Sequence, residues 1–182
     1  MTVEKLVLKA CDTRDAGRLA TLAEQAFYET YKGLMPERDL ITYIKASFTI
    51  DKLYEEISAP TNLFTLAFYE GTLVGYSKLD LRGERTGLVE LERLYLLRQY
   101  CGFQIGKNLM IKCIADTYAL GYEGLWLVVW ERNEKAISFY EQWGFSKFDT
   151  KTMMRGNDPQ IGILMKKMIN QEFANNPSII NC

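Results

Sequence analysis

The amino-acid sequence predicts an α+β fold built on a mixed, mostly antiparallel, twisted sheet of about seven strands, with helices on both faces and a central parallel β-α-β unit. Two apolar runs, Asn62 to Tyr69 and Leu73 to Leu81, flank Glu70-Gly71, which is typical of a β-hairpin. The run Leu125 to Trp130 is apolar without alternation, which is typical of a strand that is covered on both faces and paired in parallel. Segments with helical spacing lie between these strands.

The first sixty residues predict one strand and two helical regions. Residues Val3 to Ala10 alternate as a strand does, and Asp12 or Thr13 then caps a helix. That helix carries apolar residues at helical spacing, namely Ala16, Leu19, Leu22, Ala23, Ala26 and Phe27. Gly33 and Pro36 end it. The second helical region extends from about residue 36 to residue 58, with an interruption near residues 49–51.

The second half predicts the β-α-β unit and a closing pair of strands. Residues 88–97 form a strand, residues 104–120 form an amphipathic helix that Gly121 ends, and residues 125–130 return in parallel. Asn133 caps a helix that extends to Trp143. Residues 145–150 and 161–168 form an antiparallel pair joined by a turn at residues 156–159.

Length and composition predict one domain over residues 1–169 and a flexible tail over residues 170–182. The formal net charge is −1 and both signs are interspersed, so we expect no nucleic-acid partner. No apolar run approaches the length of a membrane span, so we expect no membrane partner and a cytoplasmic location. The chain has four cysteines without a C-x-x-C pair and no histidine, so we expect free thiols and no metal.

The stretch Leu91 to Leu109 is the centre of the functional prediction. It leads from an apolar strand through a glycine-containing turn into a helix, and the free N–H groups at such a helix start attract phosphate. It is neither a dinucleotide fingerprint nor a P-loop, because three residues separate Gly102 from Gly106 and Asn108 follows Lys107. A plain strand-turn-helix joint is the alternative.

This stretch resembles motif A of the GNAT superfamily of N-acetyltransferases. The matching residues are Leu94, Tyr95, Leu96, Tyr100, Gly102, Ile105, Gly106, Lys107 and Leu109. Cys101 stands where the family usually has Arg, and Gln104 stands where it usually has the middle Gly. A second block, residues 133–145, resembles the family's N-x-x-A-x-x-x-Y helix followed by Gly-Phe. Over nearly the whole chain, the closest resemblance is to the PaiA-type spermidine/polyamine N-acetyltransferases.

The resemblance implies acetyl-CoA as co-substrate and a cofactor-binding set. The backbone of Leu94, Tyr95 and Leu96 would pair with the pantetheine arm, and the N–H of Leu96 would donate to the thioester oxygen. The pyrophosphate would lie at the helix start, with Arg98 and Lys107 as countercharges, against Cys101, Gly102, Phe103, Gln104, Ile105, Gly106 and Lys107. Asn133 and Tyr140 would also contact CoA, although an N-cap role explains Asn133 equally well.

A primary amine with a reference pKa of about 10.4 needs a base at neutral pH. The candidates are Glu92, as in the polyamine enzymes, and Glu90, as in the histone-type enzymes; the alternation of a strand places both on one face. Alternatively, this face is solvated and the acids pair with Arg93 or Lys78. Glu92 is the first choice.

Tyr140 matches the tyrosine that lies beside the CoA sulfur in many members of the family, where it is the acid for the departing thiolate. Its alternative is a place in a packed stripe with Ile137 and Trp143. We also expect the first two helices to shape the acceptor pocket with Phe27, Tyr28, Glu29 and Tyr31, although these aromatic residues could equally belong to the core.

The predicted function is therefore acetylation of a small-molecule primary amine, a polyamine such as spermidine, by direct attack. Alternatives are an amino acid, an aminoglycoside or a protein amine as acceptor, or a non-catalytic module that binds CoA or polyamine, to which Cys101 and Gln104 point. Similar proteins are commonly homodimers, and the candidate contacts here are Trp143 and an exposed strand near Met165.

Overall fold

The computed structural model describes residues 5–82, 85, 87–155 and 158–169. The tail that we expect at residues 170–182 lies outside them. Within the described residues the elements follow in the order β1 (Leu6–Ala10), η1 (Thr13–Asp15), α1 (Ala16–Tyr31), α2 (Glu37–Ser47), α3 (Ile50–Ser58), β2 (Asn62–Tyr69), β3 (Thr72–Asp80), β4 (Leu88–Leu96), η2 (Arg98–Tyr100), α4 (Ile105–Ala119), β5 (Gly124–Trp130), α5 (Glu134–Gln142), β6 (Ser146–Arg155) and β7 (Asp158–Met168).

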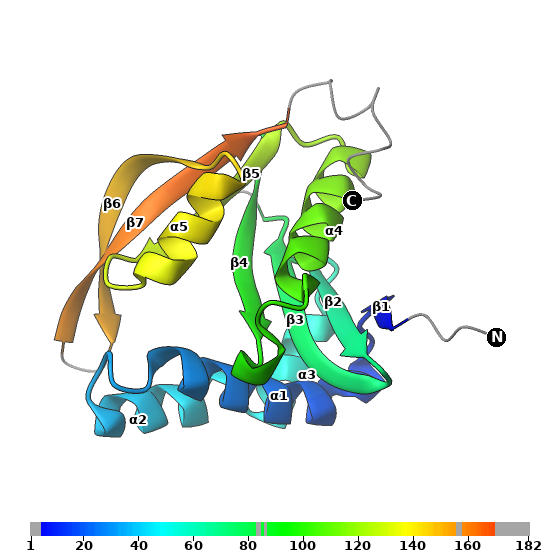
Figure 1. Cartoon of the computed structure of the whole chain (residues 1–182), viewed down its shortest axis with the longest axis vertical. Coiled ribbons are helices and arrows are strands. Elements are labelled where there is room, and N and C mark those ends of the chain that lie inside the picture. The colour runs from blue at the N-terminus through cyan, green and yellow to red at the C-terminus, as the bar shows by residue number, and fades with distance from the viewer. Residues whose placement is uncertain (1–4, 83–84, 86, 156–157, 170–182) are drawn as a thin grey trace.

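The described strands form one seven-stranded sheet in the order β1-β2-β3-β4-β5-β7-β6. Only β4 and β5 pair in parallel, and α4 is the connection between them. The predicted α+β class, the mixed and mostly antiparallel sheet and the central β-α-β unit are therefore confirmed (Figure 1).

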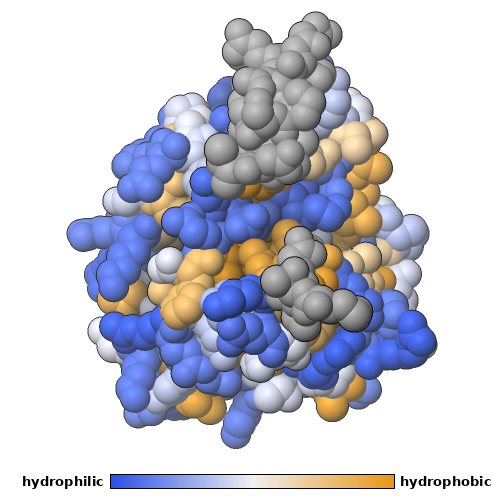
Figure 2. Space-filling model, turned by 45° about the vertical axis from the view of Figure 1, so that its right-hand side comes forward, coloured by the Kyte–Doolittle hydropathy of each residue, from blue (hydrophilic) through white to orange (hydrophobic). Residues whose placement is uncertain are grey.

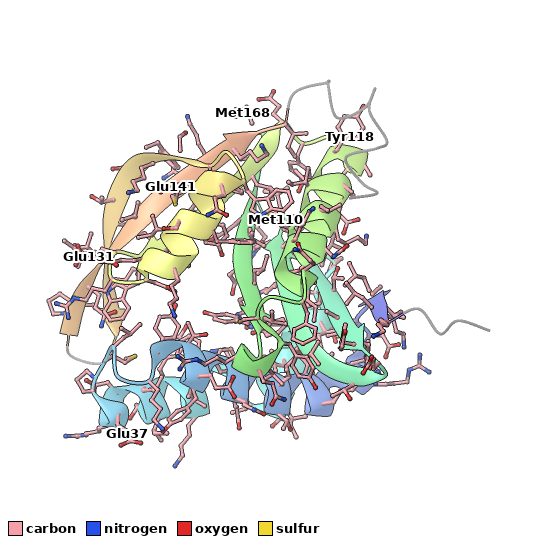
Figure 3. All side chains as sticks on the ribbon, in the orientation of Figure 1. Glu37, Met110, Tyr118, Glu131, Glu141 and Met168 are labelled. Carbon is pink, nitrogen blue, oxygen red and sulfur yellow. The ribbon has the colours of Figure 1, made fainter. Side chains whose placement is uncertain are left out.

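Helices cover both faces of the sheet and create two main core layers. On one face, residues of α1, α2 and α3 pack with Phe64, Tyr76 and Leu97. On the other face, residues of α4 and α5 pack with Val89, Leu127 and other sheet residues. Figure 3 shows Met110 on the side of α4 that faces α5, whereas Glu37 lies on the outer side of α2.

The local signals at the ends of elements match the sequence. The Asp12 side chain caps η1 in a reciprocal capping box with Asp15, so this short turn precedes α1. Glu70 and Gly71 have φ values of 49° and 80°, the left-handed conformation that a tight hairpin requires. Gly121, with φ of 79°, follows the end of α4 as predicted.

The closing hairpin differs from the prediction in length and position. β6 and β7 extend beyond the expected residues 145–150 and 161–168, because backbone pairing continues through Thr152↔Ile161 to Arg155↔Asp158. β7 lies between β5 and β6, and Met165 is fully buried. The expectation of an exposed strand near Met165 was therefore wrong.

On the face shown in Figure 2, hydrophilic residues cover most of the surface and hydrophobic residues form small patches between them. None of the helices in the described part of the chain has the length and apolar character needed to cross a bilayer.

Candidate active site

A groove of about 780 Å³ opens where β4 and β5 separate. The two strands pair only from Leu88↔Gly124 to Glu90↔Trp126. Beyond that point they diverge, β4 toward α1 and β5 behind α5 (Figure 1). The groove is bounded by the second half of β4, the start of α4, the end of β5 and one side of α5. The β4 edge that faces it is extended backbone, which can pair with an elongated ligand.

A β-bulge in β4 determines which side chains face which layer. Lys78 of β3 pairs with Arg93, but its neighbour Leu79 pairs with Leu91, so Glu92 is the extra residue of the bulge. Before the bulge, Leu91 packs in the α4 layer; after it, Tyr95 packs in the α1 layer. The carboxylate of Glu92 and the guanidinium of Arg93 consequently meet on the same side of the sheet.

The start of α4 supplies the groove with free backbone donors. The amides of Ile105, Gly106 and Lys107 belong to the first helical turn, so no carbonyl earlier in the helix accepts from them. The amides of Cys101 and Phe103 are already used inside the turn, because they donate to Arg98 O at 3.1 Å and Tyr100 O at 3.4 Å. Within residues 101–107, the amides of Ile105, Gly106 and Lys107 are therefore more available to an anion than those of Cys101 and Phe103.

Gln104 takes the left-handed conformation at the N-cap of α4, with φ of 62° and ψ of 6°. Residues other than Gly adopt this conformation at a cost of about 1 kcal/mol or more. The sequence comparison had found Gln at a position where Gly is usual, and the backbone explains why Gly is usual there. The exposed side chain of Gln104 lies at the wall of the groove.

The charge of the groove suits a polyanion such as CoA. Six basic side chains and three acidic ones line it, a net charge of +3 in a chain whose formal net charge is −1. The basic residues are Lys32, Arg93, Arg98, Lys107, Arg132 and Lys135. Together with the N-terminal end of the α4 dipole, they fit a group that carries several phosphates.

Tyr140 and Asn133 reach the groove from α5. The Oδ1 of Asn133 accepts a hydrogen bond of 3.2 Å from the N–H of Ala136, so Asn133 caps α5 and also lines the groove. The ring of Tyr140 packs edge-on against Phe139 and Phe145. Burial raises the pKa of Tyr140 above its ordinary value, so the phenol stays protonated near neutral pH and can donate a hydrogen bond into the groove.

Glu92 belongs to a closed ring of four charged side chains. Its Oε2 lies 2.6 Å from Lys78 Nζ and its Oε1 lies 3.1 Å from Arg93 Nη2. Both cations also contact Glu56 of α3, Lys78 at 3.1 Å and Arg93 through two hydrogen bonds of 2.8 and 3.0 Å. Burial opposes ionisation of Glu56, but Arg93 and Lys78 hold its pKa below the ordinary value. The paired alternative therefore holds for Glu92.

A second cavity, of about 500 Å³, lies on the α3 side of the sheet. Five carboxylates and two cations line it, a net charge of −3: Glu55, Glu56, Asp80, Glu90, Glu92, Lys78 and Arg82. Glu92 is the one residue that lines both this cavity and the large groove. Among the described residues no three side chains are grouped as a metal site would require.

The structure gathers most of the predicted residues around the groove, but two lie elsewhere. The groove is lined by Glu92, Leu94, Tyr95, Leu96, Cys101, Gly102, Gln104, Ile105, Gly106, Lys107, Asn133 and Tyr140. Glu90 lines the acidic cavity instead. The side chain of Phe103 is half exposed and packs against Tyr69 and Tyr100, outside the groove.

Sequence reasoning missed Glu56 as a member of the site and treated Lys78 only as a pairing partner. Lys78 is 2% exposed in the second half of β3, between the buried residues Ser77 and Leu79. A lysine within a strand that otherwise reads as buried was the available signal. Glu56 gave none, because a charged residue on a short helix usually faces solvent.

Three comparisons place these features among known proteins. A model of the acetyltransferase (GNAT) family matches residues 21–145. An uncharacterized N-acetyltransferase of Lactobacillus delbrueckii subsp. lactis is 30% identical over 162 residues, which cover 86% of this chain and 93% of that protein. The spermidine N(1)-acetyltransferase of Thermoplasma acidophilum is 29% identical over 147 residues, 79% of this chain and 89% of that one. The crystal structure of the PaiA N-acetyltransferase from Thermoplasma acidophilum in complex with coenzyme A has a TM-score of 0.79 and 27% identity, and covers 91% of this chain and 100% of that one.

Proposed function

The chain belongs to the GNAT family and is an acetyl-CoA-dependent N-acetyltransferase similar to PaiA, and from this premise we propose that its acceptor is a polyamine such as spermidine. The observation that carries the proposal is the position of Glu92 between the positive groove and the acidic cavity. A carboxylate at that junction can take the proton of an amine whose remaining charges lie in the cavity.

The groove suits acetyl-CoA by charge and by shape. In this proposal the amides of Ile105, Gly106 and Lys107 hold the pyrophosphate, helped by the Arg98 and Lys107 side chains. The edge of β4 at Leu94 to Leu96 holds the pantetheine arm, and the N–H of Leu96 donates to the thioester oxygen as negative charge develops on it. Acetyl-CoA supplies an acetyl group activated as a thioester.

In this proposal Glu92 is the general base and Tyr140 is the general acid. Glu92 accepts a proton from the acceptor ammonium, directly or through one water, which leaves a neutral amine. The amine nitrogen forms the new bond to the acetyl carbon, the carbon–sulfur bond breaks, and the electron pair of that bond stays on sulfur. Tyr140 gives its proton to the thiolate and regains one from solvent as the product nitrogen loses its second proton. Glu90 is the alternative base, on the cavity wall.

The acidic cavity supports a polyamine as the acceptor over a singly charged amine. Its net charge of −3 attracts the further ammonium groups of such a substrate. The buried Oδ1 of Asn62, in the wall of the cavity, has no hydrogen-bond partner within the described residues, so it can accept from an ammonium. The name of the Thermoplasma acidophilum relative points to the same class of substrate.

The test is a comparison of acceptors, with the acetylated product identified by mass. We expect spermidine and spermine to have a kcat/KM at least about 100-fold above that of an amino acid, an aminoglycoside or a lysine peptide. Glu92→Gln lowers kcat with spermidine by about 100-fold or more. Tyr140→Phe also lowers kcat, while acetyl-CoA still binds. Equal or faster acetylation of one of the other amines would overturn the choice of acceptor, and full activity of Glu92→Gln would overturn the choice of base.

A matched control separates the charge of the cavity from the chemistry. Glu55 is exposed on α3 and lines the cavity without a place in the charge ring. We expect Glu55→Gln to raise KM for spermidine by about 3- to 10-fold, since an exposed charge contributes about 1 kcal/mol, and to leave kcat unchanged. An unchanged KM would contradict the proposal that the cavity holds the distal ammonium groups.

A further inference from the structure

Lys78 is a buried cation that the proposed mechanism does not use. It lies in the interior strand β3, between β2 and β4, with 2% of its surface exposed. A lysine buried to this degree loses most of its hydration, which is costly unless anions surround it. Its Nζ contacts Glu92 at 2.6 Å and Glu56 at 3.1 Å. The fold therefore holds one cation between the proposed base and a second carboxylate.

We propose that Lys78 and Glu56 are positioning residues for Glu92: Lys78 fixes the orientation of its carboxylate, and Glu56 compensates the positive charge beside it. This inference rests on the proposed role of Glu92 as the base. It adds two residues from two other elements, β3 and α3, whose charges act on the reaction through Glu92.

The contacts fix the orientation of the Glu92 carboxylate. Lys78 contacts Oε2 and Arg93 contacts Oε1, so each oxygen has its own cation and the group cannot rotate without losing both. Each carboxylate oxygen has about two lone-pair sites, so both oxygens keep room for an amine or a water. The side chain of Glu92 is 28% exposed, which leaves one side accessible from the groove and cavity.

Glu56 balances the two cations. Without it, Lys78 and Arg93 would place two positive charges against the single negative charge of Glu92 and suppress its uptake of a proton. Glu56 contacts both cations at 2.8 to 3.1 Å and makes the ring of four neutral. Glu92 thus stays held by cations while part of their charge is compensated from α3.

Other charged and titratable groups near Glu92 complete its surroundings. On β3 and just after it are Tyr76, Asp80 and Arg82; on β4 is Glu90; on α3 is Glu55. Burial raises the pKa of Tyr76 above its ordinary value, so its phenol is neutral at the pH of the assays. Asp80 and Arg82 contact each other. Variants at Lys78 and Glu56 leave all of these groups in place.

The experiment compares the pH dependence of kcat/KM for spermidine in Lys78→Met, Glu56→Gln and the double variant. The acid limb is the part of the profile in which kcat/KM falls at low pH. We expect it to move to higher pH by about one unit in Lys78→Met, which removes a positive charge beside Glu92, and to lower pH in Glu56→Gln, which removes a negative charge. The double variant returns the limb close to its original position, with a lower kcat because Oε2 has lost its partner. Ionisation of spermidine itself is the same in every variant.

Controls distinguish this inference from loss of structure and from failure of the proposed function. Lys112→Met removes another ion-paired lysine, on α4, and leaves the profile unchanged. Glu56→Gln is nearly isosteric, so it carries the test alone should Lys78→Met not fold. The inference is wrong if Glu92→Gln is inactive but the acid limbs of Lys78→Met and Glu56→Gln move in the same direction or do not move. An active Glu92→Gln would instead refute the base itself.

Discussion

The carboxylate of Glu29 in α1 accepts a hydrogen bond of 2.7 Å from the backbone N–H of Arg98, 69 residues later in the chain. Its other oxygen accepts from the side chain of Gln25 at 2.9 Å. This bond attaches the connection between β4 and α4 to the first helix. The sequence predicts Glu29 near the acceptor pocket; in the structure its carboxylate binds the backbone of η2, which leads into the start of α4.

Glu29→Ala tests whether this bond supports the loop. It removes the acceptor of a backbone N–H, so we expect the free energy of unfolding to fall by about 1 kcal/mol. We also expect KM for acetyl-CoA to rise, because η2 leads directly into the start of α4. Urea unfolding and steady-state kinetics measure the two effects. Glu24→Ala, an exposed carboxylate on the same helix, should change neither; an unchanged KM in Glu29→Ala would restrict the bond to a structural role.

Gln104→Gly tests the strain at the N-cap of α4. Gly adopts a φ of 62° without steric cost, so we expect relief of strain to raise the free energy of unfolding by about 1 kcal/mol. The greater conformational entropy of Gly in the unfolded chain offsets part of this gain. Acetyl-CoA should bind more tightly, because the backbone can approach phosphate more closely. Gln104→Ala keeps the Cβ and is the control, which should gain no stability. Equal stability of the two variants would show that the left-handed conformation is not strained.

The sequence predicted the elements whose signals are local. Gly71, Gly121 and Asn133 identified a hairpin, a helix end and a helix start, and the apolar run at residues 125–130 identified the parallel partner of β4. The residues that line the groove could be predicted from the GNAT motif, because its strand and glycines lie within sixteen consecutive residues, 94–109.

The parts that the sequence could not predict depend on tertiary register. Glu90 and Glu92 lie on one face, as the alternation predicts, but regular alternation would put Arg93 on the opposite face, whereas the bulge brings it beside Glu92. A bulge changes the phase of a strand by one residue and has no signature in a single sequence. Glu56, 36 positions before Glu92, shares Lys78 and Arg93 with it, and this depends on how α3 packs on the sheet, which the sequence does not show.

Cysteine labelling tests the groove as the acetyl-CoA site without turnover. Cys101 is exposed and lines the groove. Burial raises the pKa of Cys11 and of Cys113 to about 12 in each case, so both thiols stay protonated and unreactive near neutral pH. In a Cys182→Ser background we expect iodoacetamide to modify Cys101 first. Acetyl-CoA at ten times its Kd should slow the reaction about 10-fold.

The matched ligand control for this labelling is spermidine alone, which carries no phosphate and should leave Cys101 reactive. Mass spectrometry of the peptides reports each site separately. Equal labelling of Cys101 with and without saturating acetyl-CoA would contradict the assignment of the groove, whatever the acceptor proves to be.

Alkaline pH should destabilise the fold through three tyrosines. Burial raises the pKa of Tyr76, Tyr95 and Tyr140 above the ordinary value, and the neighbouring Tyr31 raises that of Tyr95 further. In the unfolded chain these phenols lose their protons near pH 10, whereas in the folded protein they keep them. Their contribution to stability is therefore complete below about pH 10 and is lost as the pH rises above it, at up to about 4 kcal/mol per pH unit for three protons.

Urea unfolding between about pH 8 and pH 11 measures this slope, and tyrosinate absorbance of the folded protein counts the phenols that stay protonated. Tyr140→Phe should reduce the slope by about one third, because one of the three protons is gone. Tyr118→Phe, an exposed tyrosine on α4, is the control and should leave the slope unchanged. An identical slope in wild type and Tyr140→Phe would mean that Tyr140 ionises in the folded protein as it does in the unfolded chain. It could then not remain the neutral proton donor that the proposed mechanism requires at alkaline pH.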